Sequence, residues 1–289
     1  MLEEGVALAK LTTIGTGGVA QAFARPSTLA ELEWALAWAA ERELQVATVG
    51  LGSNLLAADE GVDALVLKLG GDLASVRIEG DLLAAGGGAT NAVCLHGARA
   101  AGLGGFEFAC AIPGTAGGGV RMNAGAYGSD WSNILVRAHV FTVVGDAWMT
   151  PESLGLAYRS SELGRGDVVA EVEYRLVPRP PDEIKATVAA LIAQRKATQP
   201  TNKRTFGSVF KNPDHELGAG RMLEACGLKG HVIGGALISP MHANFIENAG
   251  GATTADALAL MAEARRRARE QFGVELEHEV QLLGPIAVT

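Results

Sequence analysis

The stretch from Gly104 to Gly128 reads GGFEFACAIPGTAGGGVRMNAGAYG, and it decides more about the fold than any other part of the chain. It contains eight glycines and very little charge. Glycine is favoured where the backbone takes a positive φ or must approach another group closely. Phe106, Phe108 and Val120 make the stretch too apolar for a flexible linker. The simplest interpretation is a buried loop whose amides wrap a large, partly anionic ligand, and a glycine-rich turn between packed strands is the alternative.

The composition is that of a globular protein whose 289 residues suffice for two domains and a substantial core. Apolar residues make up 48% of the chain, yet no run approaches the roughly 18 apolar residues of a membrane span. The start, MLEEGVALAK, is acidic and lacks an apolar signal region, which predicts a cytoplasmic protein. A net charge of −8 disfavours general nucleic-acid binding, because that relies on basic surface.

The three cysteines show no metal-ligand spacing. Cys94, Cys110 and Cys226 lie far apart in the chain, so they do not form a ligand pair of the C-x-x-C kind. An odd number of cysteines in a cytoplasmic protein indicates buried thiols rather than a disulfide framework. We therefore expect no metal centre.

Helix and strand patterns alternate through the first part of the chain. Thr28 and Glu31 form a capping box before a leucine stripe, which predicts a helix that extends to about Glu41. Thr90 is placed to cap a second helix that reaches about Ala101. Runs of β-type residues predict strands at Gln45–Val49, Ala64–Leu69, Ile134–Val144 and Val168–Val177.

The composition changes at the prolines of positions 178, 180 and 181, where we place a domain boundary. Beyond them the sequence predicts a helix over residues 182–196, a polar and basic loop at Gln199–Lys211, a helix from Thr254 to Phe272 and a strand over residues 275–283. The last turns of the predicted helix from Thr254 to Phe272 are basic, which suits the negative end of its dipole. Gly273 ends this helix.

The loop Gly50-Leu51-Gly52-Ser53-Asn54-Leu55 is the first candidate ligand site. A dinucleotide-binding fingerprint would have its third glycine at Leu55, and no G-x-x-x-x-G-K-[ST] loop occurs, so a Rossmann or P-loop site is disfavoured. Clustered amides and the small side chains of Ser53 and Asn54 nevertheless suit a pyrophosphate. A tight strand–loop turn is the alternative.

Ser208 lies in the second candidate, Gly207-Ser208-Val209-Phe210-Lys211-Asn212-Pro213. A serine between a glycine and apolar residues can be a positioned proton donor. Since a hydroxyl is a poor acid, it would need a developing carbanion beside it. A surface turn that ends at Pro213 is the alternative.

Charged residues supply the remaining candidates. Arg159 offers the two-pronged donor geometry that neutralises a carboxylate or enolate, unless it is simply solvated. Glu279 lies in the predicted last strand, where a glutamate is usually exposed, and His242 has apolar neighbours that favour a structural role. A basic cluster either forms a solvated face or meets an anionic substrate, and its members are Arg195, Lys196, Lys203, Arg204 and Lys211.

Taken in chain order, these segments resemble the UDP-N-acetylenolpyruvoylglucosamine reductase family from about Leu11 to Gly284. The segments that carry the resemblance are Thr12-Thr13-x-x-x-x-Gly17-Gly18, Gly50-Leu51-Gly52-Ser53-Asn54-Leu55-Leu56, Ile112-Pro113-Gly114-Thr115, Met122-Asn123-Ala124-Gly125-Ala126-Tyr127-Gly128, Tyr158-Arg159-x-Ser161, Gly207-Ser208-Val209-Phe210-Lys211-Asn212-Pro213, His242-Ala243-Asn244-Phe245-Ile246 and Leu276-Glu277-x-Glu279-Val280. Each motif is weak alone, and their order makes the resemblance specific.

The resemblance implies an α+β protein of the shorter form of the family. Residues 1–178 would form an FAD-binding domain of the vanillyl-alcohol-oxidase (PCMH) type, with two subdomains divided near residues 70–80. Residues 179–289 would form an α+β substrate-binding domain. The implied cofactors are non-covalent FAD and NADPH as hydride donor, and the implied substrate is UDP-N-acetylenolpyruvoylglucosamine, in the synthesis of bacterial peptidoglycan precursors.

The resemblance also implies roles for residues by position. Ser208 matches the proton donor, and Arg159 and Glu279 match the pair that polarises the enolpyruvyl carboxylate. The matches to substrate contacts are Tyr158, Lys196, Lys211, Asn212 and His242. The matches to FAD contacts are Gly50, Leu51, Gly52, Ser53, Asn54, Leu55, Pro113, Gly114, Thr115, Gly118, Gly119, Asn123, Ala124 and Gly125.

Some features depart from the family or leave the function open. The departures are Ala111, Arg121, Met241 and Gln281, which put substrate contacts in question rather than the reaction. A flavin oxidase of the same fold is disfavoured, because the loop at residues 50–54 lacks the His or Cys of a covalent flavin link. A non-catalytic nucleotide-sugar binding module is disfavoured by the intact set of catalytic matches.

Overall fold

The computed structural model describes residues 2–288, which form two compact units. The first unit consists of residues 2–4, Ala22–Leu51 and Ala64–Gln194, and the second of Gly5–Gln21, Gly52–Asp63 and residues 195–288. Each unit is thus assembled from segments that are distant in the sequence. The division at residue 178 remains a prediction about functional domains.

The bounds of the elements within the described residues are as follows. The α-helices are α1 (Leu29–Ala40), α2 (Asn91–Ala100), α3 (Ala116–Arg121), α4 (Pro181–Thr198), α5 (Ala219–Ala225) and α6 (Thr254–Phe272). The 3-10 helices are η1 (Leu8–Lys10), η2 (Gly71–Ala74), η3 (Glu107–Ala111) and η4 (Trp131–Asn133). The strands are β1 (Leu2–Ala7), β2 (Val19–Ala24), β3 (Gln45–Thr48), β4 (Leu55–Ala57), β5 (Val62–Leu67), β6 (Val76–Glu79), β7 (Leu82–Gly86), β8 (Leu103–Gly104), β9 (Gly125–Ala126), β10 (Ser129–Asp130), β11 (Leu135–Thr142), β12 (Gly145–Met149), β13 (Val168–Arg175), β14 (Val177–Pro178), β15 (Thr205–Ser208), β16 (Val232–Ile233), β17 (Ala236–Ile238), β18 (Phe245–Asn248) and β19 (Gln281–Leu283).

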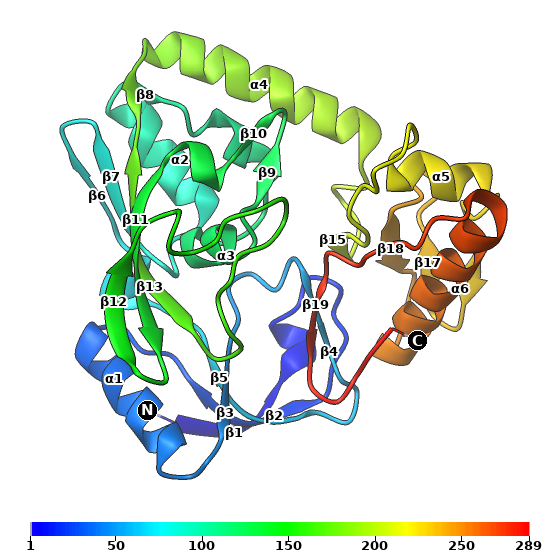
Figure 1. The fold of residues 1–289 in the computed structure, drawn as a ribbon, viewed down its shortest axis with the longest axis horizontal. Coiled ribbons are helices and arrows are strands. Elements are labelled where there is room, and N and C mark those ends of the chain that lie inside the picture. The colour runs from blue at the N-terminus through cyan, green and yellow to red at the C-terminus, as the bar shows by residue number, and fades with distance from the viewer. Residues whose placement is uncertain (1, 289) are drawn as a thin grey trace. The chain divides into compact units, whose positions relative to one another are not determined.

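The first unit is built on an antiparallel sheet with the strand order β12-β11-β13-β7-β6 (Figure 1). Apolar residues of β13 contribute to two separate buried clusters, one shared with α2 and α3 and the other with α1. A second sheet has the order β1-β2-β5-β3, in which β3 and β5 run parallel. Two short antiparallel pairs complete the strands of this part of the chain: the hairpin of β9 and β10, and the pairing of β8 with the distant β14.

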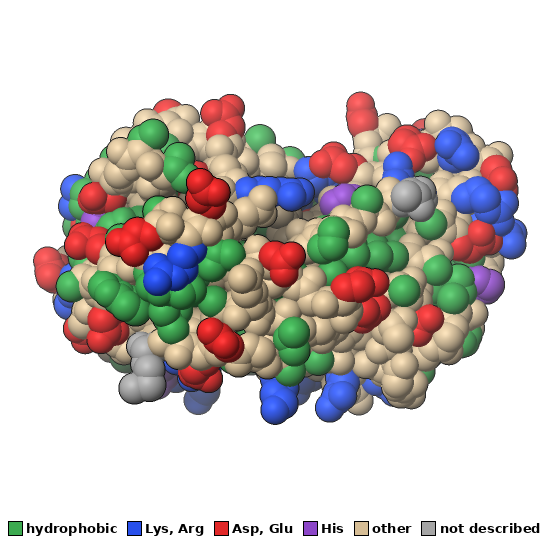
Figure 2. Space-filling view, turned by 90° about the horizontal axis from the view of Figure 1, so that it is seen from below, with side chains coloured by type: hydrophobic (Ala, Val, Ile, Leu, Met, Phe, Trp, Pro, Cys, Tyr) green, Lys and Arg blue, Asp and Glu red, His purple; other side chains and the backbone are tan. Residues whose placement is uncertain are grey.

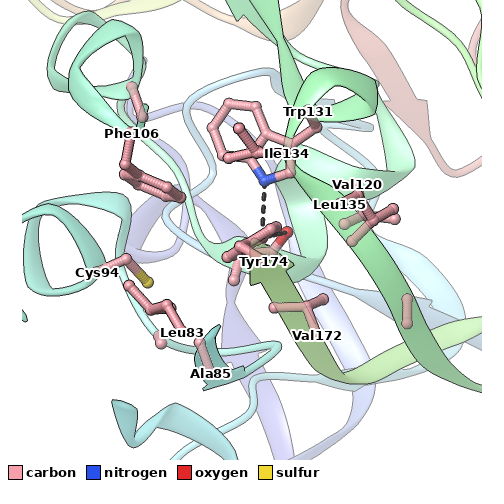
Figure 3. Packing of buried hydrophobic residues seen from close by; sticks show 14 of the residues in the cluster. Leu83, Ala85, Cys94, Phe106, Val120, Trp131, Ile134, Leu135, Val172 and Tyr174 are labelled. Atoms are coloured by element: carbon pink, nitrogen blue, oxygen red, sulfur yellow. Dashed lines mark hydrogen bonds between the residues drawn. The ribbon is translucent and has the colours of Figure 1, made fainter. Parts of the chain in front are cut away.

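Aromatic side chains fill the core behind α3 (Figure 3). Trp131 and Tyr174 are fully buried, and Trp131 Nε1 donates a 2.7 Å hydrogen bond to the Tyr174 hydroxyl. Phe106 and Phe108 pack edge-on against the Trp131 ring at centroid distances of 5.8 and 5.1 Å. Burial of such side chains stabilises the fold by roughly 1.5–3 kcal/mol each. The cluster therefore gives α3 a rigid support.

The second unit contains an antiparallel sheet with the order β15-β18-β17-β16, against which α6 packs (Figure 1). Leu260 and Met261 of α6 are fully buried in the core of this unit. A separate parallel pair, β4 with β19, brings residues 55–57 beside residues 281–283. Both termini of α6 carry local signals, since Thr253 and Asp256 form a capping box and Gly273 takes a left-handed φ of 67°.

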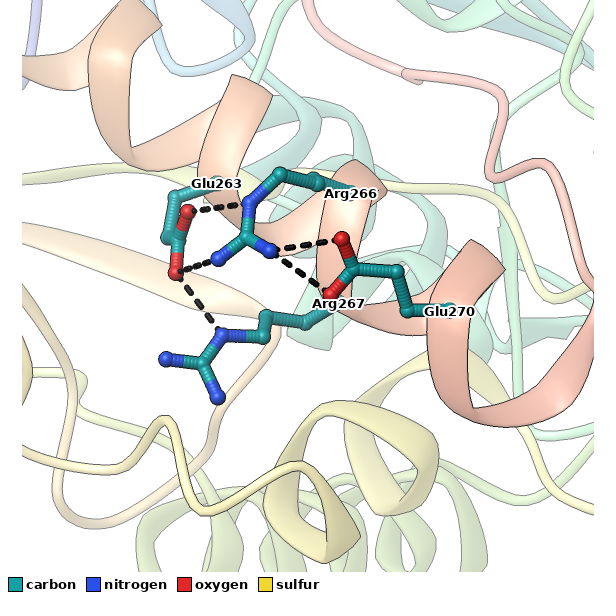
Figure 4. A network of polar contacts seen from close by, with 4 residues as sticks. All are labelled: Glu263, Arg266, Arg267 and Glu270. Atoms are coloured by element: carbon teal, nitrogen blue, oxygen red, sulfur yellow. Dashed lines mark hydrogen bonds and ion pairs between the residues drawn. The ribbon is translucent and has the colours of Figure 1, made fainter.

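The basic last turns of α6 form an ion-pair network (Figure 4). Glu263 accepts hydrogen bonds from Arg266 and Arg267, three and four residues ahead, and Arg266 also binds Glu270. The hydrogen bonds from these arginines lower the pKa of Glu263 to about 2. The arginines of this helix thus serve side-chain pairing as well as the helix dipole.

Most of the predicted elements are confirmed, and four details are wrong. Inside the predicted loop at residues 199–211, Thr205–Ser208 form the strand β15, which pairs with β18. Within residues 275–283 only Gln281–Leu283 is a strand. The glycine-rich stretch contains the helix α3 rather than loop alone. In the box at α1, Thr28 accepts from Glu31 N as predicted, but the Glu31 carboxylate accepts from Ser27 N instead of Thr28 N.

Of the three cysteines, Cys94 is buried, and Cys110 and Cys226 are half-buried. Burial raises the pKa of the Cys94 thiol to about 12. Across residues 2–288 no cluster of three or more His, Cys, Asp or Glu side chains could hold a metal ion. In the same range, none of the helices has the length and apolarity needed to cross a membrane. Basic side chains lie among acidic ones on the face shown in Figure 2.

Candidate active site

The glycines of the loop at residues 50–55 are required by protein neighbours within each unit. In the first unit an added Cβ at Gly50 would lie 2.6 Å from Thr115 Oγ1, and the Gly50 carbonyl accepts a 2.9 Å hydrogen bond from Lys68 Nζ. In the second unit Gly52 has a φ of 65°, and an added Cβ would lie 2.0 Å from the Leu11 carbonyl oxygen. Both positions exclude any side chain, because backbone or a buried threonine already occupies the space.

The rest of this loop divides between exposure and pairing. Leu51 is exposed, whereas Leu55 begins β4 and pairs in register with Gln281 of β19. The carbonyl of Ser53 lies 3.2 Å from where a Cβ of Gly207 would be. The loop therefore lies close to the Ser208 segment within the second unit.

The buried glycines of α3 allow close packing. An added Cβ at Gly119 would lie 2.4 Å from the Trp131 ring, and one at Gly117 would lie 3.0 Å from the Val169 carbonyl oxygen. Both residues are buried. They let α3 rest directly on the sheet and on the aromatic core.

Two other glycines of this segment have room for a side chain. An added Cβ at Gly118 would meet only Thr115 Oγ1 at 3.4 Å, and one at Gly114 only Asn91 Nδ2 at 3.5 Å. Packing does not require glycine at either position, and Gly118 is exposed, as is Pro113. Thr115 caps α3 by accepting from Gly118 N at 3.4 Å. Bare backbone at the start of a helix suits the pyrophosphate of FAD, so these residues fit the implied cofactor.

Asn123 connects α3 to the segments around it. It is buried, with a φ of 36°, and its Oδ1 accepts from Ser132 N at 3.0 Å while its Nδ2 donates to the Ala157 carbonyl at 3.0 Å. The next residue, Ala124, bonds Gly119 O through its N–H and accepts from Trp131 N. The segment predicted to lie beside the flavin is thereby fixed to the aromatic core.

Arg159 lies on a tight turn in the first unit. Ala157 and Ser160 exchange backbone hydrogen bonds across it, and Arg159 takes a φ of 55°, which is uncommon for a residue with a Cβ. Its Nη2 donates a 2.5 Å hydrogen bond to the Gly125 carbonyl, and its guanidinium lies 4.9 Å from the centroid of the exposed Tyr158 ring. An added Cβ at Gly125 would lie 2.9 Å from Arg159 Nη1, so glycine there makes room for the arginine.

Ser208 ends β15 in the second unit, between the buried Phe206 and Val209. The segment is held by Asn244, whose backbone oxygen accepts from Val209 N at 2.9 Å. The Asn244 side chain, buried itself, accepts from Phe210 N and donates to the Phe210 carbonyl at 2.9 and 2.8 Å. The serine is therefore anchored on its C-terminal side by a complete set of backbone hydrogen bonds.

Glu279 lies beside Ser208 in the same unit. Its backbone N–H donates a 2.8 Å hydrogen bond to the carbonyl of Val209, the residue after Ser208. Its own carbonyl accepts from Asn54 Nδ2 at 3.2 Å, and the Asn54 carbonyl accepts from Gln281 N. The structure thus brings Ser208, Glu279 and Asn54 together, whereas Arg159 belongs to the first unit.

Two predicted substrate contacts meet at the first turn of α5. Asn212 Oδ1 accepts from Ala219 N at 3.0 Å, which caps this helix. His242 lies against Gly220, where an added Cβ would be 2.5 Å from His242 Cε1, and its Nδ1 accepts from Asn244 N at 3.2 Å. Burial, and then the charge of Lys229, lowers the pKa of His242. The imidazole is therefore neutral near pH 7.

The two predicted lysine contacts differ in their surroundings. Lys211 Nζ pairs with the exposed Glu277 carboxylate at 2.6 Å. Lys196 is exposed in the last turn of α4.

Two positioning residues were missed by sequence reasoning. Asn244 lies in the motif at residues 242–246, which predicts no role for it, and Lys68, which holds the Gly50 carbonyl, belongs to no predicted site. Burial, and then the nearby Arg25, lowers the pKa of Lys68. Their partners lie 34 and 18 residues away in the chain, so local pattern carries no sign of these contacts.

Comparison with protein families matches both parts of the chain. A family model described as "FAD binding domain" matches residues 20–149. A second, described as "UDP-N-acetylenolpyruvoylglucosamine reductase, C-terminal domain", matches residues 199–283. The α+β fold with an FAD-binding domain, predicted from the sequence, is confirmed.

Individual relatives agree over nearly the full length. UDP-N-acetylenolpyruvoylglucosamine reductase 2 of Symbiobacterium thermophilum is 42% identical, with 96% of this chain and 90% of the relative covered. The reductase of Bacillus licheniformis is 39% identical, with 97% and 93% covered. The solved structure of UDP-N-acetylenolpyruvylglucosamine reductase from Thermus caldophilus superposes with a TM-score of 0.86 at 36% identity, covering 98% of this chain and all of that one. The chain therefore belongs to the UDP-N-acetylenolpyruvoylglucosamine reductase family.

Proposed function

We propose that this chain reduces the enolpyruvyl ether of UDP-N-acetylenolpyruvoylglucosamine to UDP-N-acetylmuramate, with NADPH as the hydride donor and non-covalently bound FAD. The observation that carries the proposal is the hydrogen-bonded junction of Ser208, Val209 and Glu279 in a chain of this family. The reaction belongs to bacterial peptidoglycan synthesis, and hence to cell-wall biogenesis, cell shape and division. A cytoplasmic location and the lack of a nucleic-acid partner stay predictions.

The residues proposed to hold FAD lie in two loops. Gly114, Thr115 and Gly118 offer backbone with room beside it and a capping hydroxyl, which favours contact with phosphate oxygens. Gly50 and Gly52 keep the other loop compact, so that its amides are clustered. The segment 123–125 is proposed to lie beside the flavin ring.

The catalytic roles follow from where charge develops. The chemistry that bound FAD supplies is the relay of a hydride from NADPH to C3 of the enolpyruvyl group. Negative charge then builds at C2 and on the carboxylate. Arg159 and Glu279 stabilise this charge, with Glu279 either protonated or orienting a donor. Ser208 donates a proton to C2, where a carbanion provides the driving force that a hydroxyl donor needs.

Substrate binding is proposed to involve the groups around the first turn of α5. Asn212 and His242 meet there as a capping amide and a neutral imidazole, which suit the oxygens of a nucleotide-sugar. Tyr158, Lys196 and Lys211 are proposed as further contacts. The two lysines would supply positive charge to the diphosphate.

Product analysis tests the proposed function. The purified protein is incubated with NADPH and UDP-N-acetylenolpyruvoylglucosamine, and the products are followed by mass spectrometry and NADPH absorbance. We expect a product heavier than the substrate by two hydrogen atoms and one NADPH oxidised for each product formed. NADPH oxidation that requires oxygen and leaves the enolpyruvyl ether intact would contradict the proposal.

A further inference from the structure

Arg121, the last residue of α3, binds backbone carbonyls of a single loop. Its Nη1 and Nη2 each donate to the Gly164 carbonyl at 3.3 Å, and Nη2 donates to the Asp167 carbonyl at 2.6 Å. A longer contact of 3.5 Å joins Nη1 to the Leu163 carbonyl. One side chain thus fixes the backbone over residues 163–167. The guanidinium suits this task because it presents several donors in a rigid plane, which a lysine does not.

The environment of Arg121 disfavours its charge. Burial lowers the pKa of its guanidinium, and the attraction of the Asp167 carboxylate acts in the opposite direction. That carboxylate accepts a 2.7 Å hydrogen bond from Gly164 N, so it closes the loop that Arg121 holds. A charge kept partly out of water in this way is costly unless its donors are satisfied, which the carbonyls achieve.

The loop that Arg121 holds is the one that carries Arg159. Ser161 Oγ donates a 2.7 Å hydrogen bond to the Arg121 carbonyl, and Asn123 Nδ2 donates to the Ala157 carbonyl at 3.0 Å. Residues 121 and 123 therefore bind the loop on both sides of Arg159. The side chain of Arg121 adds hydrogen bonds further along the loop, at residues 163–167.

The backbone of Arg159 is strained, so its conformation depends on hydrogen bonds from the neighbouring segments. A φ of 55° is unfavourable for a residue with a Cβ, and it persists only where the surroundings fix it. The turn at residues 157–160 contributes two backbone hydrogen bonds of its own. The contacts from residues 121 and 123 restrain the chain on both sides of the turn.

We propose that Arg121 is a positioning residue for the reduction of the enolpyruvyl ether, because it holds Arg159 in the conformation in which its guanidinium can meet the substrate carboxylate. This inference rests on the role proposed above for Arg159. Arg121 acts through Arg159 and not on NADPH. Its loss therefore slows the second half-reaction, from reduced flavin to substrate, and spares the first, from NADPH to flavin.

Anaerobic stopped-flow measurements on Arg121→Met, Arg159→Met and the double variant test the proposal. In Arg121→Met we expect flavin reoxidation by the enolpyruvyl ether to slow by about 10- to 100-fold, the size of effect that small misplacements produce. Flavin reduction by NADPH should stay within about twofold, as should FAD content. In the Arg159→Met background, Arg121→Met should slow reoxidation no further, because the two residues act as one unit.

Arg137→Met is the matched control. Arg137 lies in the same unit and donates two hydrogen bonds to Glu173 on the sheet surface. The variant therefore shows the effect of losing arginine hydrogen bonds outside the loop. Both of its half-reactions should match those of the parent. If Arg121→Met fails to fold, Arg121→Lys keeps the charge with fewer donors in the plane and serves in the same cycle.

Four results would overturn the inference. Equal slowing of both half-reactions, or an undiminished further loss in the Arg159→Met background, would mean that Arg121 supports the unit in general. Slow reoxidation in Arg159→Met together with normal reoxidation in Arg121→Met would rule out the positioning role of Arg121 and leave the role of Arg159 intact. Normal reoxidation in Arg159→Met would remove the proposed role of Arg159, and the inference with it.

Discussion

Ser208 is the single residue whose proposed chemistry depends most on its surroundings. Phe206 and Val209 are buried on either side of it, and the Glu279 backbone binds the Val209 carbonyl. None of these contacts involves the Ser208 hydroxyl. That arrangement suits a group that must meet a carbanion formed only during the reaction.

Replacing Ser208 by Ala separates a proton donor from a turn-forming residue. The two side chains are similar in size, so folding and FAD content should be retained. If Ser208 protonates C2, flavin reduction by NADPH stays normal and reoxidation by the enolpyruvyl ether slows by about 10²–10⁴-fold. Normal reoxidation, or slowing confined to the NADPH step, would leave Arg159 and Glu279 as the catalytic candidates.

His242 makes the stability of the second unit depend on pH. Its pKa in the folded chain lies below its ordinary value of 6.5, so the unfolded chain takes up the proton first as the pH falls. The imidazole contribution to stability is therefore complete above the ordinary pKa and is lost as the pH falls below it. We expect unfolding in urea at pH 8 and pH 5.5 to differ less in His242→Gln than in the parent. An unchanged difference would show that the imidazole is not desolvated.

At the scale of elements, the glycines of α3 test where the cofactor approaches. In Gly118→Ala the methyl group has room, so thermal stability should be kept or rise, by up to about 1 kcal/mol from helix propensity. FAD binding to the apoprotein should nevertheless weaken by about tenfold or more, equivalent to about 1.4 kcal/mol, as measured by quenching of flavin fluorescence. Unaltered affinity would place the pyrophosphate elsewhere.

Gly119→Ala is the matched change one residue along the same helix. Its Cβ would lie 2.4 Å from the Trp131 ring, so it should destabilise the fold by about 1–3 kcal/mol through overpacking. The pair therefore separates a glycine required by the core from a glycine left bare for a ligand.

The elements also show how far local sequence specifies structure. The ends of α6 follow from its capping box and from Gly273, which act within a few residues. The bounds of the helix and the stop at Gly273 were predicted, whereas the capping box is seen only in the structure. Helix α3 was not, because three consecutive glycines have low helix propensity and only packing on Trp131 and the sheet stabilises them. Residues 275–280 alternate like a strand, yet their partners, such as Phe210, lie far away in the chain and pair with them only at isolated points.

At the scale of the molecule, the site residues could be predicted only through the family resemblance. No short-range pattern links Asn54 to the Glu279 carbonyl, because 225 residues separate them. The resemblance predicts which residues react, and the structure adds what holds two of them, Ser208 and Glu279, side by side. It also shows that the Asn54 amide, predicted as a cofactor contact, binds the protein backbone.

FAD is predicted to bind without a covalent link to the chain. The loops proposed to bind it contain glycines and small polar side chains, and the loop at residues 50–54 has no His or Cys that could attach to a flavin. Acid precipitation of the purified protein should therefore release all of the flavin into the supernatant. Flavin that stays with the pellet would indicate a covalent link and contradict the proposed binding.

The flavin spectrum under anaerobic conditions tests the central claim most directly. The purified protein should be yellow, and one equivalent of NADPH should bleach it. Adding UDP-N-acetylenolpyruvoylglucosamine, without oxygen, should restore the oxidised spectrum in a single turnover. A bleached flavin that stays reduced with this substrate, and recovers only when oxygen is admitted, would contradict the proposed function.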